Sequence, residues 1–196
     1  MPRAFLAAIF DLDGVITNTA MTHARAWKAV IDPRVDRPFD LDRDYKLHVA
    51  GRPRADGLKD FFASREMVLP DDDIAAMSAR KNDLYLELLE SEGVRVNPEM
   101  IARMALYSAA GLKIGIASGS KNARKVIDLA CLTIPGVLVD GHDVEALGLR
   151  PKPAPDIFIH VAQILGVAYA QCIVFEDSRA ALAQIAPARG VLVEMP

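Results

Sequence analysis

Residues 5–14 read FLAAIFDLDG. Its first six residues, Phe5 to Phe10, form a continuous apolar run that stops at Asp11, which is the pattern of a strand buried on both faces of a parallel sheet. Later apolar runs of the same form lie at 113–117, 172–175 and 191–193, with a weaker candidate at 136–139. Helical stretches separate these runs, so we predict an α/β fold with a Rossmann-like parallel sheet.

The stretch between the first two apolar runs has a different character. Residues 19–96 contain several helical patterns and no convincing strand. In the last of these helices Ile74, Met77 and Leu84 share one face, and Lys81 lies on the same stripe, either as a side chain snorkelling at the rim or as a phosphate contact. We therefore predict a helical cap domain at 19–96, inserted after the first strand of a core formed by 1–18 and 97–196.

Composition excludes several classes of partner. The chain has 23 basic and 26 acidic residues, and its net charge of -3 provides no electrostatic footprint for nucleic acid or an anionic membrane. No apolar stretch is long enough to span a bilayer, and we expect a cytoplasmic protein.

Cys131 and Cys172 lack metal-ligand spacing, and we expect both to be buried free thiols.

Polar and acidic residues follow three of the predicted strands. Asp11 and Asp13 follow the first, Ser118-Gly119-Ser120 the second, and Glu176-Asp177 a later one. Ligands of open parallel sheets bind beyond the carboxyl ends of the strands, so these groups should meet at one edge. Two like charges about 4 Å apart repel by roughly 4 kcal/mol at an effective dielectric of 20, so such carboxylates need a cation. Oxygen ligands without His or Cys favour Mg²⁺, held by Asp11, Asp13, Glu176 and Asp177.

A phosphoryl group bound at this edge would need positive charge on the side away from the metal. Lys152, in a loop stiffened by two prolines, and Ser118 fit that need, and the backbone N–H groups around Gly119 can point at an anion. An isolated Asp-x-Asp or Ser-Gly-Ser is usually structural, but this order along the sheet predicts phosphoryl transfer. We expect Asp11 to attack the phosphate and Asp13 to handle the proton.

The sequence resembles the haloacid dehalogenase superfamily, whose four motifs match residues Asp11 to Thr17, Ser118, Lys152 and Glu176-Asp177. The resemblance implies that Asp11 forms an aspartyl-phosphate and that Asp13 is the general acid and base. It also implies that Ser118 and Lys152 hold the phosphate, and that Glu176 and Asp177 bind Mg²⁺. Asp13 argues against the metal-free dehalogenase branch, which lacks this second acid.

The resemblance is closer to one subfamily, the beta-phosphoglucomutases, which interconvert beta-glucose 1-phosphate and glucose 6-phosphate. The segments that match are 10–17, 25–28, 81–83, 120–122 and 152–158, although Asn18 stands where the subfamily usually has Asp. The segment 129–149 is short, and the chain ends soon after 191–193, where relatives continue into a further strand and helix. The substrate-binding residues that the resemblance implies are Thr19, His23, Trp27, Arg54, Lys81, Ser120, Lys121 and Asn122, with Thr19 and His23 supporting Asp13.

Three other functions stay open at this point. A phosphatase of the same fold, in which water hydrolyses the aspartyl-phosphate, would share every core motif, and only the cap residues favour the mutase. A signalling receiver module would carry its acceptor Asp after a middle strand and would need no helical insertion. An inactive sugar-phosphate binder is the third. For the enzyme we expect a small phosphorylated sugar as partner and a monomeric state.

Overall fold

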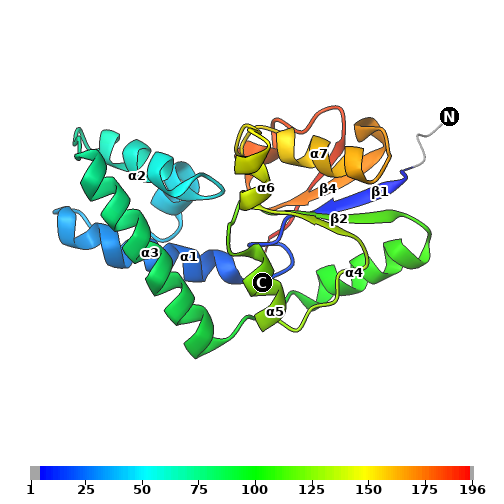
Figure 1. The fold of residues 1–196 in the computed structure, drawn as a ribbon, viewed down its shortest axis with the longest axis horizontal. Helices are drawn as coiled ribbons and strands as arrows, with labels where there is room; N and C mark the ends of the chain where they lie inside the picture. The colour runs from blue at the N-terminus through cyan, green and yellow to red at the C-terminus, as the bar shows by residue number, and fades with distance from the viewer. Residues whose placement is uncertain (1–4, 195–196) are drawn as a thin grey trace. The chain divides into compact units, whose positions relative to one another are not determined.

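The computed structural model describes residues 5–194, and its chain divides into two compact units. One unit, here called the α/β unit, comprises residues 1–18 and 94–196. The other, the helical unit, comprises residues 19–93. The predicted α/β fold with a helical insertion after the first strand is confirmed (Figure 1).

The α/β unit is built on a five-stranded sheet in which every neighbouring pair is parallel. Its order is β3-β2-β1-β4-β5, so β1 lies at the centre and all its residues are buried. The weak candidate at 136–139 forms β3, and the last strand begins two residues before the apolar run at 191–193. The strands are β1 (Ala7–Phe10), β2 (Lys113–Ala117), β3 (Val137–Val139), β4 (Cys172–Glu176) and β5 (Arg189–Leu192).

Strand register places the ends of three strands level with one another. Phe10 pairs with Ile116 of β2 on one side and with Phe175 of β4 on the other. Just beyond, the amide N–H of Asp11 donates to the carbonyl oxygen of Phe175 at 2.9 Å. Since parallel strands end at the same edge, Asp11 comes level with the next residue of β4, which is Glu176.

Helices cover the two faces of this sheet. α7 packs against β1, β2 and β3 over a buried apolar cluster, and α4 packs against β2. Asn97 caps the start of α4, because its side chain accepts hydrogen bonds from the amides of Glu99 and Met100. The helices of this unit are α4 (Pro98–Ala109), α5 (Ala123–Leu129), α6 (Gly141–Ala146), α7 (Asp156–Ile164), α8 (Arg179–Leu182) and a 3-10 turn η3 (Tyr169–Gln171).

The helical unit packs around its own aromatic core. Phe39, Phe61 and Phe62 are buried there, and the ring centroids of Phe39 and Phe61 lie 5.4 Å apart. α1 and α3 pack along one another, and α2 packs on α3 and on η2. The elements are α1 (Thr19–Ile31), a 3-10 turn η1 (Asp32–Arg34), a π-helical turn η2 (Tyr45–Val49), α2 (Arg54–Ala63) and α3 (Asp71–Glu92).

The two cysteines differ in exposure, and the prediction that both are buried is wrong for Cys131. Cys172 is buried at the start of β4, and burial raises the pKa of its thiol to about 11. Cys131 is exposed because it follows the end of α5 with a φ of 51°, where its amide N–H donates to the carbonyl oxygen of Asp128 and the chain turns at the surface. Both thiols are free.

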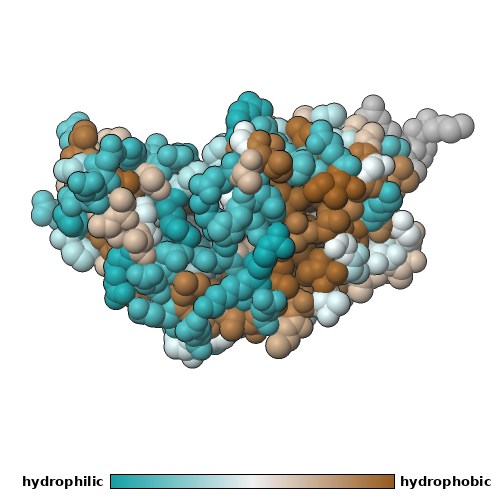
Figure 2. Space-filling view, viewed as in Figure 1, coloured by the Kyte–Doolittle hydropathy of each residue, from teal (hydrophilic) through white to brown (hydrophobic). Residues whose placement is uncertain are grey.

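Hydrophobic side chains also reach the surface of the α/β unit. In Figure 2 the hydrophobic colour gathers on this unit, whereas the visible face of the helical unit is largely hydrophilic. Among the exposed apolar residues, Leu106 of α4 is 65% exposed and Ile164 of α7 is 50% exposed. A monomeric state stays a prediction. Within residues 5–194, no helix combines the length and the apolar character needed to cross a bilayer.

Candidate active site

A compact loop after β1 holds Asp13. The amides of Ile16 and Thr17 both donate to the carbonyl oxygen of Leu12, at 3.0 and 2.9 Å, and the amide of Gly14 donates to the carbonyl of Thr17 at 2.7 Å. Gly14 has a φ of 90°, a conformation that glycine adopts without strain. These bonds fix the backbone of Asp13 two residues beyond Asp11.

Lys152 joins two carboxylates at the centre of this edge. Its Nζ donates to Oδ1 of Asp11 at 2.6 Å and to Oε2 of Glu176 at 2.8 Å. All three residues are buried. Burial alone would lower the pKa of Lys152, but attraction to Asp11 and Glu176 outweighs it and raises the pKa above its usual range. The ammonium group is therefore a fixed positive charge beside Asp11.

Asp11, Glu176 and Asp177 form a group of carboxylates that fits a metal ion. One oxygen of each lies within 4.8 Å of the others. Burial raises the pKa of Asp11, although Lys152 opposes this, and burial followed by repulsion from Glu176 raises the pKa of Asp177 to about 7. Such carboxylates gain from a hard cation, and their oxygen donors suit Mg²⁺. Asp13, the fourth predicted ligand, is not a member of this group.

The loop after β2 folds back on its own hydroxyl groups. Ser118 is fully buried, and its Oγ donates to Oδ2 of Asp13 at 3.3 Å while accepting from the amide of Ser120 at 3.1 Å. Oγ of Ser120 in turn accepts from the amide of Asn122 at 3.1 Å. Helix α5 begins at Ala123, directly after this loop. The structure thus brings Ser118 to Asp13, with Gly119 in the same loop.

One residue that is predicted to bind the substrate already forms an ion pair within the protein. Nζ of Lys121 lies 2.8 Å from Oε2 of Glu145 on α6, and both side chains are exposed. The hydrogen bond from Lys121, followed by the attraction of its charge, lowers the pKa of Glu145. A phosphate that binds Lys121 must compete with this ion pair.

Sequence reasoning missed the buried Asp140, which precedes α6. Its side chain accepts from the amides of His142 and Asp143, at 2.8 and 3.2 Å, and the carboxylate of Asp143 accepts from the amide of Asp140. Nε of Arg124 lies 2.7 Å from Oδ2 of Asp140. The capping-box spacing of two acids three residues apart was the signal that could have found this helix start.

In the helical unit, Lys81 lies among aromatic rings. It is 2% exposed, and its Nζ lies 2.5 Å from Nδ1 of His23. The same Nζ lies 4.9 Å from the ring centroid of Trp27 and 4.8 Å from that of Tyr85, which stacks on the His23 ring. Three of the predicted substrate residues are therefore neighbours within this unit, and Lys81 does not snorkel outward.

Two further predicted residues lie in the same unit. Nη2 of Arg54, the first residue of α2, donates to Oδ1 of Asn82 on α3 at 2.7 Å. Burial lowers the pKa of Arg54. Thr19 is buried as the first residue of α1. The bond to Asn82 fixes the Arg54 guanidinium, which can bind an anion with its other donors.

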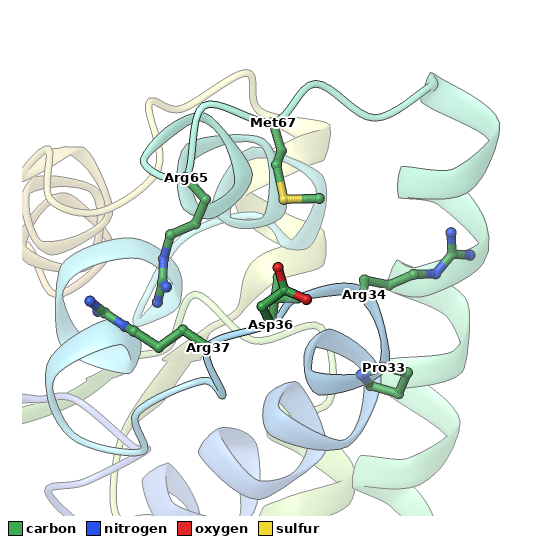
Figure 3. A pocket seen from close by; sticks show the side chains of 7 residues that line it. Pro33, Arg34, Asp36, Arg37, Arg65 and Met67 are labelled. Atoms are coloured by element: carbon green, nitrogen blue, oxygen red, sulfur yellow. The ribbon is translucent and has the colours of Figure 1, made fainter.

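A separate pocket of about 630 Å³ in the helical unit contains none of the predicted site residues (Figure 3). Arg37 and Arg65 line it, and both pair with the buried Asp44, at 3.9 and 2.8 Å. Arg34 also lines it and pairs with Asp73 at 3.6 Å. These carboxylates offset the guanidinium charges, so the pocket is a poor anion site.

Known proteins place the chain in a family. A model of haloacid dehalogenase-like hydrolases matches residues 5–185. A beta-phosphoglucomutase of Mycobacterium bovis is 36% identical over 203 aligned residues, covering 93% of this chain and 78% of that protein. Hexitol phosphatase A of Escherichia coli is 31% identical, covering 88% of this chain and 74% of that protein. The crystal structure of a beta-phosphoglucomutase from Clostridium difficile superposes with a TM-score of 0.79 at 26% identity, covering 97% of this chain and 85% of that one. With the family model matched over most of its length, the chain is an enzyme of the haloacid dehalogenase-like hydrolase family.

Proposed function

We propose that the protein is a Mg²⁺-dependent enzyme that transfers a phosphoryl group of a small sugar phosphate through Asp11, as a beta-phosphoglucomutase. The observation that carries the proposal is the arrangement at Asp11. Its carboxylate lies 2.6 Å from the buried ammonium of Lys152 and belongs to a carboxylate group that suits a cation. Asp13, two residues on, shares a hydrogen bond with Ser118.

The proposed reaction has several steps. An oxygen of Asp11 attacks the phosphorus and forms an aspartyl-phosphate, while Asp13 donates a proton to the leaving sugar oxygen. A hydroxyl group of a sugar phosphate then gives its proton to Asp13 and takes the phosphoryl group from Asp11, which gives a sugar bisphosphate. The bisphosphate reorients and returns its other phosphoryl group to Asp11, while Asp13 gives the proton back to the leaving sugar oxygen, so the product leaves with Asp11 phosphorylated and Asp13 in its starting protonation state.

Mg²⁺ would be held by Asp11, Glu176 and Asp177, with Asp13 as the further predicted ligand. When bound, the ion neutralises charge on the phosphoryl oxygens and positions them. Lys152 supplies a second positive charge from this chain, and the hydroxyl of Ser118 and the backbone N–H of Gly119 are the assigned hydrogen-bond donors. Together these groups would stabilise the negative charge of the transferred phosphoryl group.

The preference for a mutase rests on residues outside the carboxylate group. We assign the sugar phosphate to Arg54, Lys81, His23, Thr19 and Trp27 of the helical unit, and to the loop residues Ser120, Lys121 and Asn122. A mutase must also exclude water, since water would hydrolyse the aspartyl-phosphate, and we assign that task to the helical unit. The name of the Mycobacterium bovis relative supports this choice.

A sugar phosphatase of the same family is the second candidate. The name of the Escherichia coli relative, a hexitol phosphatase at 31% identity, favours it. The groups around Asp11 serve both reactions, because only the acceptor in the second step differs. A cytoplasmic location also stays a prediction.

Product analysis separates the two functions. The purified chain is incubated with Mg²⁺, beta-glucose 1-phosphate and a trace of glucose bisphosphate, and glucose 6-phosphate and free phosphate are measured together. Glucose 6-phosphate without phosphate release supports the mutase, and phosphate release alone supports the phosphatase. Asp11→Asn should abolish either activity while the protein stays folded, and appreciable turnover by this variant would refute the role of Asp11.

A further inference from the structure

The first turn of α6 contacts the backbone of the loop that follows β2. Gly141 is buried, and its amide N–H donates to the carbonyl oxygen of Ser120 at 3.1 Å. Two residues earlier, the carbonyl oxygen of Val139 accepts from the amide of Ser118 at 3.0 Å. The end of β3 and the start of α6 therefore hold both serines of this loop through main-chain hydrogen bonds.

Gly141 leaves no room for a side chain against this loop. A Cβ atom placed on it would lie 2.6 Å from the carbonyl oxygen of Gly119, 2.8 Å from the amide nitrogen of Lys121 and 2.9 Å from the carbonyl carbon of Ser120. All three are main-chain atoms, so none can turn aside by changing rotamer. Glycine is the residue that permits so close an approach of two backbones, and any side chain must displace the loop or the helix.

Side-chain hydrogen bonds and ion pairs hold the start of α6. Asp140 is fully buried and caps α6 by accepting from two amides, while Asp143 accepts from the amide of Asp140. The guanidinium of Arg124 on α5 adds ion pairs to Asp140 at 2.7 Å and to Asp143 at 3.3 Å. A clash at Gly141 should therefore be relieved by movement of the loop.

We propose that Gly141 is a positioning residue that sets the conformation of the loop at 118–122. It touches no substrate itself. It acts through Ser118, Gly119 and Ser120, which the proposed function assigns to phosphate and substrate binding, and the inference rests on that function. A methyl group at this position shifts the phosphate donors away from Asp11.

The test compares Gly141→Ala with Gly190→Ala as a matched control. A Cβ on Gly190 would lie 2.6 Å from Ile185 Cδ1 and 2.8 Å from Leu182 Cδ2, as tight as at Gly141, but against side-chain ends in place of the loop. Both variants should melt at lower temperature. Only Gly141→Ala should lower kcat/KM, by about 10- to 100-fold, and weaken competitive inhibition by inorganic phosphate. A kcat/KM within about twofold of that of Gly190→Ala would overturn the proposal.

Arg124→Gln provides a second variant in case Gly141→Ala does not fold. It adds no atom to the interface and removes the ion pairs of Arg124 with Asp140 and Asp143, which hold α6 to α5, so a smaller fall in kcat/KM is expected. Hydrogen exchange of the loop amides at 119–121 is measured in the same variant and should be faster than in the original protein. Unchanged exchange would count against the positioning role even if the original protein shows no phosphoryl transfer, an outcome that would refute the proposed function separately.

Discussion

Nζ of Lys152 lies 2.6 Å from Oδ1 of Asp11 and also bonds Glu176, so one buried ammonium is shared by two buried carboxylates. Burial disfavours all three charges, and each charge depends on the others for compensation. These three side chains also take part in the proposed chemistry, because Lys152 would attract the phosphate that Asp11 attacks. The balance of charge among Lys152, Asp11 and Glu176 therefore also contributes to the stability of the α/β unit.

Lys152→Met should destabilise the protein by about 3–5 kcal/mol, because it leaves Asp11 and Glu176 buried without their cation. Urea denaturation measures the change, and added Mg²⁺ should restore part of it. Arg150→Gln is the control, since Arg150 is exposed and its surface pair with Asp156 should contribute less than about 1 kcal/mol. If the two variants had the same midpoint, the buried pair would contribute nothing particular to stability.

The metal-free protein should lose stability as pH rises from about 4 to about 7. Burial and Glu176 raise the pKa of Asp177 from its ordinary value of 3.8 to about 7. In this window the folded state retains a proton that the unfolded state has released, so raising the pH favours unfolding. Thermal melts in metal-free buffers between pH 5 and 8 test this, and Asp177→Asn should flatten the profile. A stability that increased over this range would contradict the prediction.

Mg²⁺ binding should respond to pH in the opposite direction. The ion needs the ionised form of Asp177, whose fraction rises from roughly a tenth at pH 6 to nine tenths at pH 8 for a pKa of about 7. Calorimetric titration should show about tenfold tighter binding at pH 8 than at pH 6. The titration should also show that protons are released when the ion binds at pH 6. Proton release is detected as a heat of binding that changes with the ionisation enthalpy of the buffer. Equal affinity at both pH values would mean that Asp177 does not bind the ion as a carboxylate.

The carboxylate edge could be predicted from sequence because it depends on short-range patterns. The apolar run before Asp11 and the one before Glu176 each predict a buried strand, and parallel strands bring the residues after their carboxyl ends to one edge. The sequence does not state the register, which pairs Phe10 with Phe175 and so brings Asp11 level with Glu176. Lys152 was placed at this edge because a bound phosphoryl group needs positive charge there, and the resemblance implied the same role.

Other features depend on contacts that no local pattern contains. The bond between His23 and Lys81 joins residues 58 positions apart, and helical periodicity shows only that Lys81 lies on an apolar stripe. The approach of Gly141 to the loop requires the ends of β2 and β3 to be known to atomic precision. Cys131 was assigned to the interior as cysteines usually are, yet the turn that ends α5 places it at the surface.

Glu145→Gln should lower KM for a sugar phosphate by about two- to fivefold without changing kcat. The reason is that Lys121 loses the carboxylate that lies 2.8 Å from its ammonium, so a phosphate no longer competes for it. Steady-state kinetics at low ionic strength measure this, and the gain should fade with added salt. Glu99→Gln, which breaks a comparable surface pair with Arg103 on α4, is the control and should leave KM unchanged. An unchanged KM in Glu145→Gln would remove Lys121 from the substrate site.

Lys81→Met should separate function from stability in the helical unit. Lys81 is 2% exposed and lies against Trp27, Tyr85 and His23, and methionine has a similar length without the charge. Methionine keeps the apolar length of the side chain against these rings, so the variant should stay folded.

If Lys81 binds the sugar phosphate, the same variant should lose at least about tenfold in kcat/KM, since a charge-assisted contact to the anion is lost. Thermal melts and kinetics on one preparation read both effects. Met77→Leu, a conservative change on the same face of α3, is the control and should leave kcat/KM unaltered. Full activity with a lowered melting temperature would instead assign Lys81 a structural role, and the preference for a mutase would lose one of its supports.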